Sequence, residues 1–132
     1  MLGKTFRLVF QNATGSALGA SDAATVTGIL KNFSSSGVLT FSATQTLFNT
    51  SVASLASNGY AYGTTFDNSS VAYLEGDLLA TATLTPAAGQ CNWWIQESPD
   101  GGTTWPANGN GELIGVMTVT ATGAQPNINM SI

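Results

Sequence analysis

The amino-acid sequence predicts an all-β fold, an antiparallel β-sandwich or jelly roll. Apolar and polar residues alternate with a period of two in most segments, which is the pattern of half-buried strands. Breaks rich in Gly, Asn and Ser separate these segments at short intervals. Helical periodicity is nearly absent, so the chain has no crossover helices with which to connect parallel strands.

The first half of the chain contains three predicted strands. Residues 5–10 place Phe6, Leu8 and Phe10 on one face, opposite Thr5 and Arg7. Residues 24–30 form the second strand, and residues 37–48 alternate apolar side chains with Thr and Ser to form the third. Residues 49–70 have the least regular pattern: 51–57 are compatible with a helical turn, and the Asn-Gly pair at 58–59 is a strong turn signal.

The second half contains four more predicted strands. Residues 71–85 form the longest, with alternate apolar residues on one face, and it ends before Pro86, which has no backbone N–H for a sheet. Residues 90–98 and 113–121 have high β-propensity, and residues 127–132 alternate as a terminal strand would at a sheet edge. Because no repeat or linker interrupts the chain, residues 1–132 are predicted to form a single β-sandwich domain.

Charged residues are unusually scarce. They make up 8% of the chain, against about 25% in an ordinary soluble domain. The three cations are Lys4, Arg7 and Lys31, and the net charge is −4, so no basic cluster is available for nucleic acid or anionic lipid. A neutral surface is suited to packing against copies of itself or against a larger assembly, where each buried charge would be costly. The sequence also has no apolar run of about 20 residues and no recognisable signal peptide.

The side chains that most enzymes need are missing. Histidine is absent and Cys91 is the one cysteine, which excludes a Cys/His zinc site and a nucleophile–histidine arrangement. We expect Cys91, near two tryptophans, to be a small buried residue. Two carboxylate pairs remain, Glu75 with Asp77 and Glu97 with Asp100. A pair about 5–9 Å apart could hydrolyse glycosides, but we expect these four carboxylates to be solvated turn residues.

A calcium site is the other chemistry that these carboxylates allow. Glu75 and Asp77, with the nearby Asp67, could bind Ca²⁺ through their oxygen atoms. No loop with regularly spaced aspartates supports such a site. We therefore predict no catalytic residues, no metal and no cofactor, and a protein that is not an enzyme.

One segment matches a sharp motif. Residues 98–105 read Ser-Pro-Asp-Gly-Gly-Thr-Thr-Trp, which resembles the Asp box at each of its defined positions: Ser98, Asp100, Gly102, Thr104 and Trp105. We expect Asp100 to accept hydrogen bonds from the following backbone amides and the glycines to adopt turn conformations. Trp105 is expected to begin the return strand of a β-hairpin. In the sialidase-like propellers that carry several such boxes, the motif is a structural turn, so the resemblance implies a hairpin and no activity.

A looser resemblance covers residues 71–122. An Ala/Thr-rich strand, the segment Trp-Ile-Gln-Glu-Ser-Pro-Asp-Gly-Gly-Thr-Thr-Trp and a Val/Thr-rich strand look like small β-sandwich proteins of tailed-bacteriophage particles. The resemblance implies a capsid decoration or cement protein on the virion surface, assembled in the host cytoplasm. Its expected partners are the major capsid protein and further copies of itself, with a trimer favoured.

Two alternatives remain open. The first is a carbohydrate-binding module, since exposed aromatic rings stack on sugars and the chain offers Trp93, Trp94, Tyr60, Tyr62 and Tyr73. Trp93 and Trp94 are consecutive, so on a strand they face opposite ways and one of them is expected in the core. The second alternative is an accessory domain of a phage tail.

The two ends of the chain also allow two arrangements. Residues 1–10 and 125–132 either complete their own sheets or add to the sheet of a neighbouring subunit.

Overall fold

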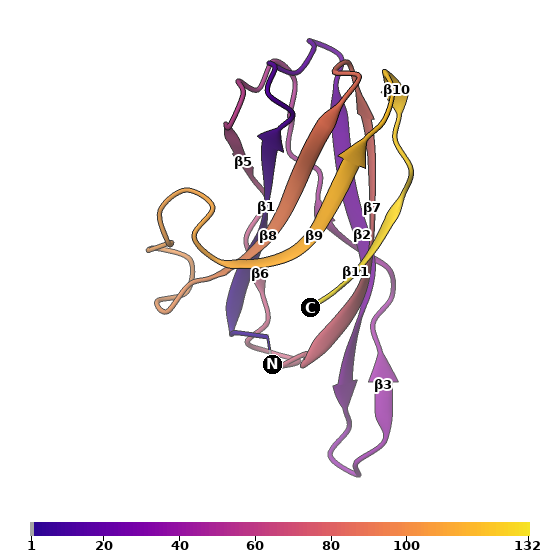
Figure 1. Ribbon diagram of the computed structural model, residues 1–132. Coiled ribbons are helices and arrows are strands. Elements are labelled where there is room, and N and C mark those ends of the chain that lie inside the picture. The colour runs from indigo at the N-terminus through magenta and orange to yellow at the C-terminus, as the bar shows by residue number, and fades with distance from the viewer. Residues whose placement is uncertain (1) are drawn as a thin grey trace.

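Two antiparallel β-sheets pack face to face and form a β-sandwich (Figure 1). The computed structural model describes residues 2–132, and this part of the chain contains eleven strands and no helix. The all-β sandwich predicted from the alternation is therefore confirmed. Accordingly, the described residues include no helix that is long and apolar enough to cross a membrane.

Sheet A has the strand order β5-β1-β8-β9, and β6 pairs with β1 on the same side as β5. The central strands β1 and β8 pair from Phe6 with Glu97 to Ala13 with Gln90. The bounds of the five strands are β1 Thr5–Ala13, β5 Tyr60–Tyr62, β6 Phe66–Asp67, β8 Gly89–Glu97 and β9 Glu112–Val119.

Sheet B has the order β10-β7-β2-β3, with β11 pairing with β7 and β4 pairing with β2. The long strands β2 and β7 form its centre and pair from Ala23 with Thr83 to Lys31 with Glu75. The bounds of the six strands are β2 Ala23–Phe33, β3 Leu39–Phe41, β4 Gln45–Phe48, β7 Glu75–Leu84, β10 Gly123–Ala124 and β11 Ile128–Ser131.

The core lies between the sheets and follows the predicted alternation. Phe6, Leu8 and Phe10 of β1 are completely buried, and Trp93 of β8 packs edge-on against Phe10 and Phe48 with ring centroids 5.0 Å apart. The inward-facing residues of β7 are buried as well: Leu78, Ala80, Ala82 and Leu84. Burying such side chains contributes about 1.5–3 kcal/mol each, which is the main stabilisation of the fold.

Three predictions of local structure between residues 37 and 85 were wrong. The strand predicted over 37–48 is two strands, β3 and β4, along the same edge of β2, because residues 42–44 stand opposite only Ile29 and Leu30 and interrupt the ladder. At this interruption Ser42 Oγ accepts a hydrogen bond from the Leu30 amide at 2.9 Å. The strand predicted from residue 71 begins at Glu75, after Ala72 with a φ of 56°. The possible helical turn at 51–57 is a run of non-helical turns, in which the Leu55 amide donates to the Val52 carbonyl.

Both described ends of the chain complete their own sheets. β1 pairs with strands on each side and lies inside sheet A. β11 pairs with β7 from Ile128 with Ala80 to Ser131 with Asp77. Within the described chain, neither terminal strand is left over for exchange with a neighbour.

Candidate functional site

The Asp-box residues form a compact turn that is closed by side-chain hydrogen bonds. Asp100 Oδ1 accepts from the amides of Thr103 and Thr104 at 3.1 and 2.8 Å and from Ser98 Oγ at 2.8 Å. The Gly102 amide donates to Ser98 Oγ at 2.8 Å. Gly101 and Gly102 have φ values of 76° and 97°, which residues with a Cβ rarely adopt.

Hydrogen bonds hold the Asp100 carboxylate in its charged form. Those from Thr104 and Ser98 lower the pKa of Asp100 to about 2, because they favour the carboxylate over the neutral acid. The charged side chain therefore acts as an internal anchor of the loop. This is a structural task, and no second carboxylate is hydrogen-bonded to it in the described chain.

The chain after the Asp-box turn does not form the return strand that was predicted. The strand expected at Trp105 begins at Glu112 instead. Pro106 has no amide hydrogen for a sheet, and the carbonyls of Pro106, Asn108 and Asn110 all accept hydrogen bonds from Gln96 Nε2 at 2.7–3.1 Å. Gln96 is completely buried and fixes the loop against β8. This residue was not predicted from the sequence, because nothing in the local pattern separates it from the other glutamines, such as the exposed Gln90.

Arg7 joins the loop to the outer face of sheet A. Its Nε and Nη2 atoms donate to Gln96 Oε1 at 3.0 and 2.9 Å. Its guanidinium carbon lies 4.4 Å from the ring centroid of Tyr62 and 4.3 Å from that of Trp105. Such cation–π contacts each contribute about 0.5–2 kcal/mol. Arg7 therefore stacks on Tyr62 and on Trp105, and its guanidinium covers one face of each ring.

The remaining aromatic residues divide between the core and this outer face. Trp93 is buried in the core, whereas Trp94 faces outward, is half-buried, and donates from Nε1 to Gln11 Oε1 at 3.3 Å. Gln11 Nε2 in turn donates to the Tyr60 hydroxyl at 3.2 Å. Tyr73 packs near Phe66 against the core. The polar atoms of this face therefore bind mostly to one another.

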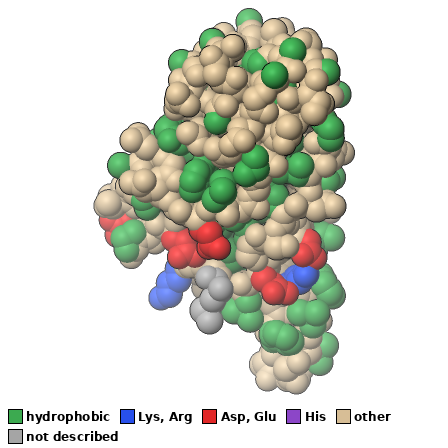
Figure 2. Space-filling model, in the orientation of Figure 1, with side chains coloured by type: hydrophobic (Ala, Val, Ile, Leu, Met, Phe, Trp, Pro, Cys, Tyr) green, Lys and Arg blue, Asp and Glu red, His purple; other side chains and the backbone are tan. Residues whose placement is uncertain are grey.

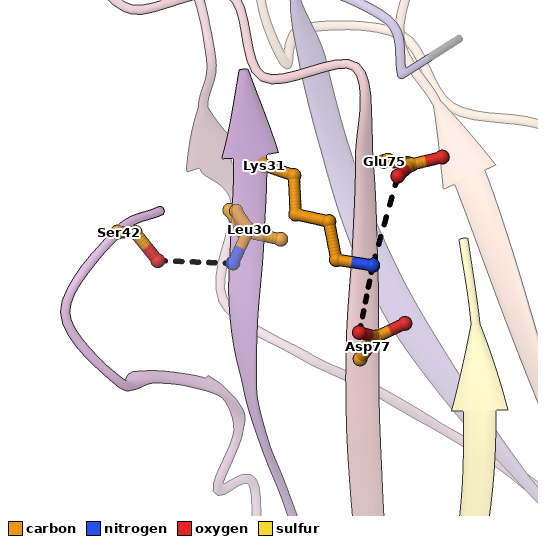
Figure 3. A network of polar contacts seen from close by, with 5 residues as sticks. All are labelled: Leu30, Lys31, Ser42, Glu75 and Asp77. Carbon is orange, nitrogen blue, oxygen red and sulfur yellow. Dashed lines mark hydrogen bonds and ion pairs between the residues drawn. The ribbon is translucent and has the colours of Figure 1, made fainter. Parts of the chain in front are cut away.

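The carboxylates named as catalytic or calcium-binding candidates have other partners. Lys31 Nζ lies 2.7 Å from Asp77 Oδ2 and 3.6 Å from Glu75 Oε1 (Figure 3). Asp67 accepts from the Ser69 amide, and Glu97 accepts from the Gly3 amide at 2.6 Å. No group of three His, Cys, Asp or Glu side chains suited to a metal ion occurs in residues 2–132.

A group of exposed large hydrophobic side chains lies on sheet B and was not predicted. The β2–β3 hairpin projects beyond the end of the sandwich (Figure 1), and Phe33, Leu39 and Phe41 on it are 55%, 42% and 62% exposed. Cross-strand pairing places Phe33 opposite Leu39 and Phe41 opposite Lys31, so these side chains share the outer face.

The apolar surface continues from the hairpin onto the body of the sandwich. Ile29 of β2 and Leu79 of β7 are exposed on the same outer face. With Phe41 they line an open groove of about 330 Å³. We call the five residues Ile29, Phe33, Leu39, Phe41 and Leu79 the hairpin face. Figure 2 shows hydrophobic side chains over the projecting hairpin, and the Lys or Arg and Asp or Glu side chains visible on this face lie in the lower half of the view.

The ion pairs of Lys31 neutralise the one cation in this apolar surface. The contact with Asp77 raises the pKa of Lys31, so the side chain stays charged but is paired with carboxylates. The signal for the hairpin face was present in the sequence, where Phe33 and the Val-Leu-Thr-Phe run at 38–41 flank a Ser-Ser-Ser-Gly turn. Alternation alone could not show which face of this hairpin points away from the second sheet.

Comparisons with known proteins gave no relative: no family model, no curated protein and no solved structure matches this chain.

Proposed function

We propose that this protein is a structural subunit that binds a larger protein assembly through the hairpin face. The observation that carries the proposal is the exposure of Phe33, Leu39 and Phe41 on a hairpin that projects from the sandwich. Soluble monomers rarely leave a contiguous apolar patch of this kind uncovered, and such patches mark protein contacts. A projecting hairpin can enter a joint between neighbouring subunits, which a flat sheet face cannot do.

The setting we propose is the head of a tailed bacteriophage, with the protein as a decoration or cement subunit on the capsid. The support for this setting is the resemblance of residues 71–122 to small β-sandwich virion proteins, together with the scarcity of charge. A cement subunit acts mechanically, by adding buried area across joints between major capsid subunits. A standard interface buries about 800 Å² on each partner, and the hairpin face with its surroundings is the surface available for it.

Carbohydrate binding is the weaker candidate. Sugar rings stack on free aromatic faces, but Arg7 already covers one face of Tyr62 and one of Trp105. The ring nitrogen of Trp94 and the hydroxyl of Tyr60 are both bonded to Gln11. These contacts favour a structural role for the aromatic residues on the outer face of sheet A. Together with Arg7 they fasten the 98–111 loop to this sheet.

The test is co-sedimentation with capsid shells assembled from the major capsid protein of the same genome. We expect the wild-type protein to bind and the Phe33→Ser/Phe41→Ser variant to bind at least about tenfold more weakly, because each buried Phe contributes about 1.5–3 kcal/mol. Tyr62→Ser, a matched aromatic change on sheet A, should bind as the wild type does. Loss of binding in Tyr62→Ser with full binding in the hairpin variant would overturn the assignment.

A further inference from the structure

Strand β9 has a neighbour on one side only. It pairs with β8, and no backbone hydrogen bond joins residues 112–119 to any other segment of the described chain. β9 is eight residues long, whereas the strands at the other sheet edges have two to four residues each: β3, β4, β5, β6, β10 and β11. The sandwich therefore has one long open edge, at β9 (Figure 1).

The usual protections of an edge strand are almost absent from β9. Monomeric β-proteins block such edges with Lys, Pro, short strands or bulges. β9 contains no Lys, Arg or Pro, and its one charged residue, Glu112, is the first. A register shift opposite Trp93 and Trp94 leaves Ile114 as an extra residue, after which Gly115–Val119 is regular and unprotected.

The side chains around this edge are apolar or neutral. Leu113 and Val116 are 46% and 42% exposed on the outer face, and Thr118 is exposed beside them. On the inner face β11 holds the strand in place, since a methyl group at Gly115 would lie 2.5 Å from Met130 Sδ. β11 thus packs on the face of β9 and leaves its row of backbone N–H and C=O groups unpaired.

We propose that Gly115–Val119 pairs antiparallel with the same segment of a second copy, so that sheet A continues across a two-fold axis. Unpaired backbone groups on an open edge are satisfied by another strand, and this strand is complementary to itself. In the antiparallel arrangement the two Glu112 side chains lie at opposite ends, about 20 Å or more apart at roughly 3.4 Å per residue. That separation is well beyond the screening length of about 8 Å at physiological salt.

The proposal specifies a closed dimer. A contact between identical edges is isologous, so it uses the same surface on both copies and ends with two. It therefore replaces the trimer expected from the phage resemblance. The hairpin faces lie on sheet B and remain free in such a dimer. Binding to a larger assembly can therefore fail or succeed independently of dimerisation.

Sedimentation velocity over a range of concentrations tests the dimer with two matched substitutions. Thr118→Lys puts a charge at the open edge, and Thr83→Lys makes the same change on β7, which has partners on both sides. Both threonines are exposed, so both variants should fold. We expect dimers for the wild type and Thr83→Lys, and dimerisation at least about tenfold weaker for Thr118→Lys, since an edge lysine opposes strand pairing.

Hydrogen exchange of the wild type gives a second readout that does not depend on a variant. The amides of Gly115–Val119 that point away from β8 should exchange more slowly at high than at low protein concentration. The proposal is overturned by a monomer at every concentration, by a trimer, or by a Thr118→Lys variant that dimerises like the wild type. It is also overturned by dimers that Phe33→Ser/Phe41→Ser abolishes, because the hairpin face would then be the contact between copies.

Discussion

Gln96 is the residue on which the 98–111 loop depends. Its side chain is completely buried, yet its amide oxygen accepts from Arg7 and its amide nitrogen donates to three loop carbonyls. A buried polar group is stable only when its hydrogen bonds are made, and here the bonds join β1, β8 and the loop. The Asp-box turn precedes this anchor and closes the first part of the same loop.

Replacing Gln96 tests this anchoring. Gln96→Leu keeps the volume but removes the partners of Arg7 and of the loop carbonyls, so we expect the free energy of unfolding to fall by about 2–4 kcal/mol. Gln90→Leu is the matched control, because Gln90 lies on the same strand and is exposed. Denaturant unfolding measures both. Equal stability of the two variants would show that the Gln96 hydrogen bonds do not hold the loop.

Asp100 gives the loop a pH dependence. Its pKa of about 2 lies below the usual value near 3.8, so the folded state favours the carboxylate. The stabilisation is fully present above about pH 4 and is lost as the pH falls through 2. We expect an NMR titration of the Asp100 carboxyl to have its midpoint near 2. In Asp100→Asn, stability should depend less on pH between 4 and 2, and an unchanged pH dependence would contradict the role of the carboxylate.

Residue-scale prediction from the sequence was accurate for the core and poor for the loops. Period-two alternation identified the buried faces of β1 and β7, and the opposite orientation of Trp93 and Trp94 follows from the pleat of a strand. The buried Gln96 and the Arg7 stack could not be predicted. Both depend on contacts between residues up to 98 positions apart in the sequence (Arg7 with Trp105), which local patterns do not record.

Among the elements, the β2–β3 hairpin shows where alternation fails as a guide. Residues 39–41 alternate as a half-buried strand would, but all three are exposed. The pairing with β2 turns Leu39 and Phe41 to the outer face of sheet B, and Thr40, on the inner face, lies where the hairpin projects beyond sheet A. The ladder is interrupted at Ser42, whose side chain accepts a hydrogen bond from the Leu30 amide (Figure 3), twelve residues away. The short strands β5, β6 and β10 were not predicted either, because two or three residues are too few to show the alternation of apolar and polar side chains.

The projecting position of the hairpin predicts how its variants behave. Phe33 and Phe41 contribute little to the core, so Phe33→Ser/Phe41→Ser should melt within a few degrees of the wild type, as surface changes do. This thermal melt is the control for the co-sedimentation experiment. A large fall in melting temperature would show that the hairpin face stabilises the fold. The binding experiment would then be repeated with a smaller substitution, Phe41→Leu.

For the whole molecule, the scarcity of charge explains both proposed contacts. Only 8% of the residues are charged, and Lys31, the cation beside the hairpin face, is paired with Glu75 and Asp77. The hairpin face and the β9 edge can therefore be buried without removing an unpaired charge from water, a step that costs several kcal/mol. Composition alone predicted an association surface, and the arrangement of the strands supplies the two places that we propose for it.

The salt dependence of shell binding tests the central claim most directly. Raising the salt concentration from about 0.1 M to about 1 M shortens the screening length from about 10 Å to about 3 Å, which weakens charge contacts and leaves apolar contacts intact. If the hairpin face is the docking surface, the fraction of wild-type protein that co-sediments with capsid shells should change by less than about twofold over this range. A fall of tenfold or more would contradict the account and show that charged contacts carry the binding.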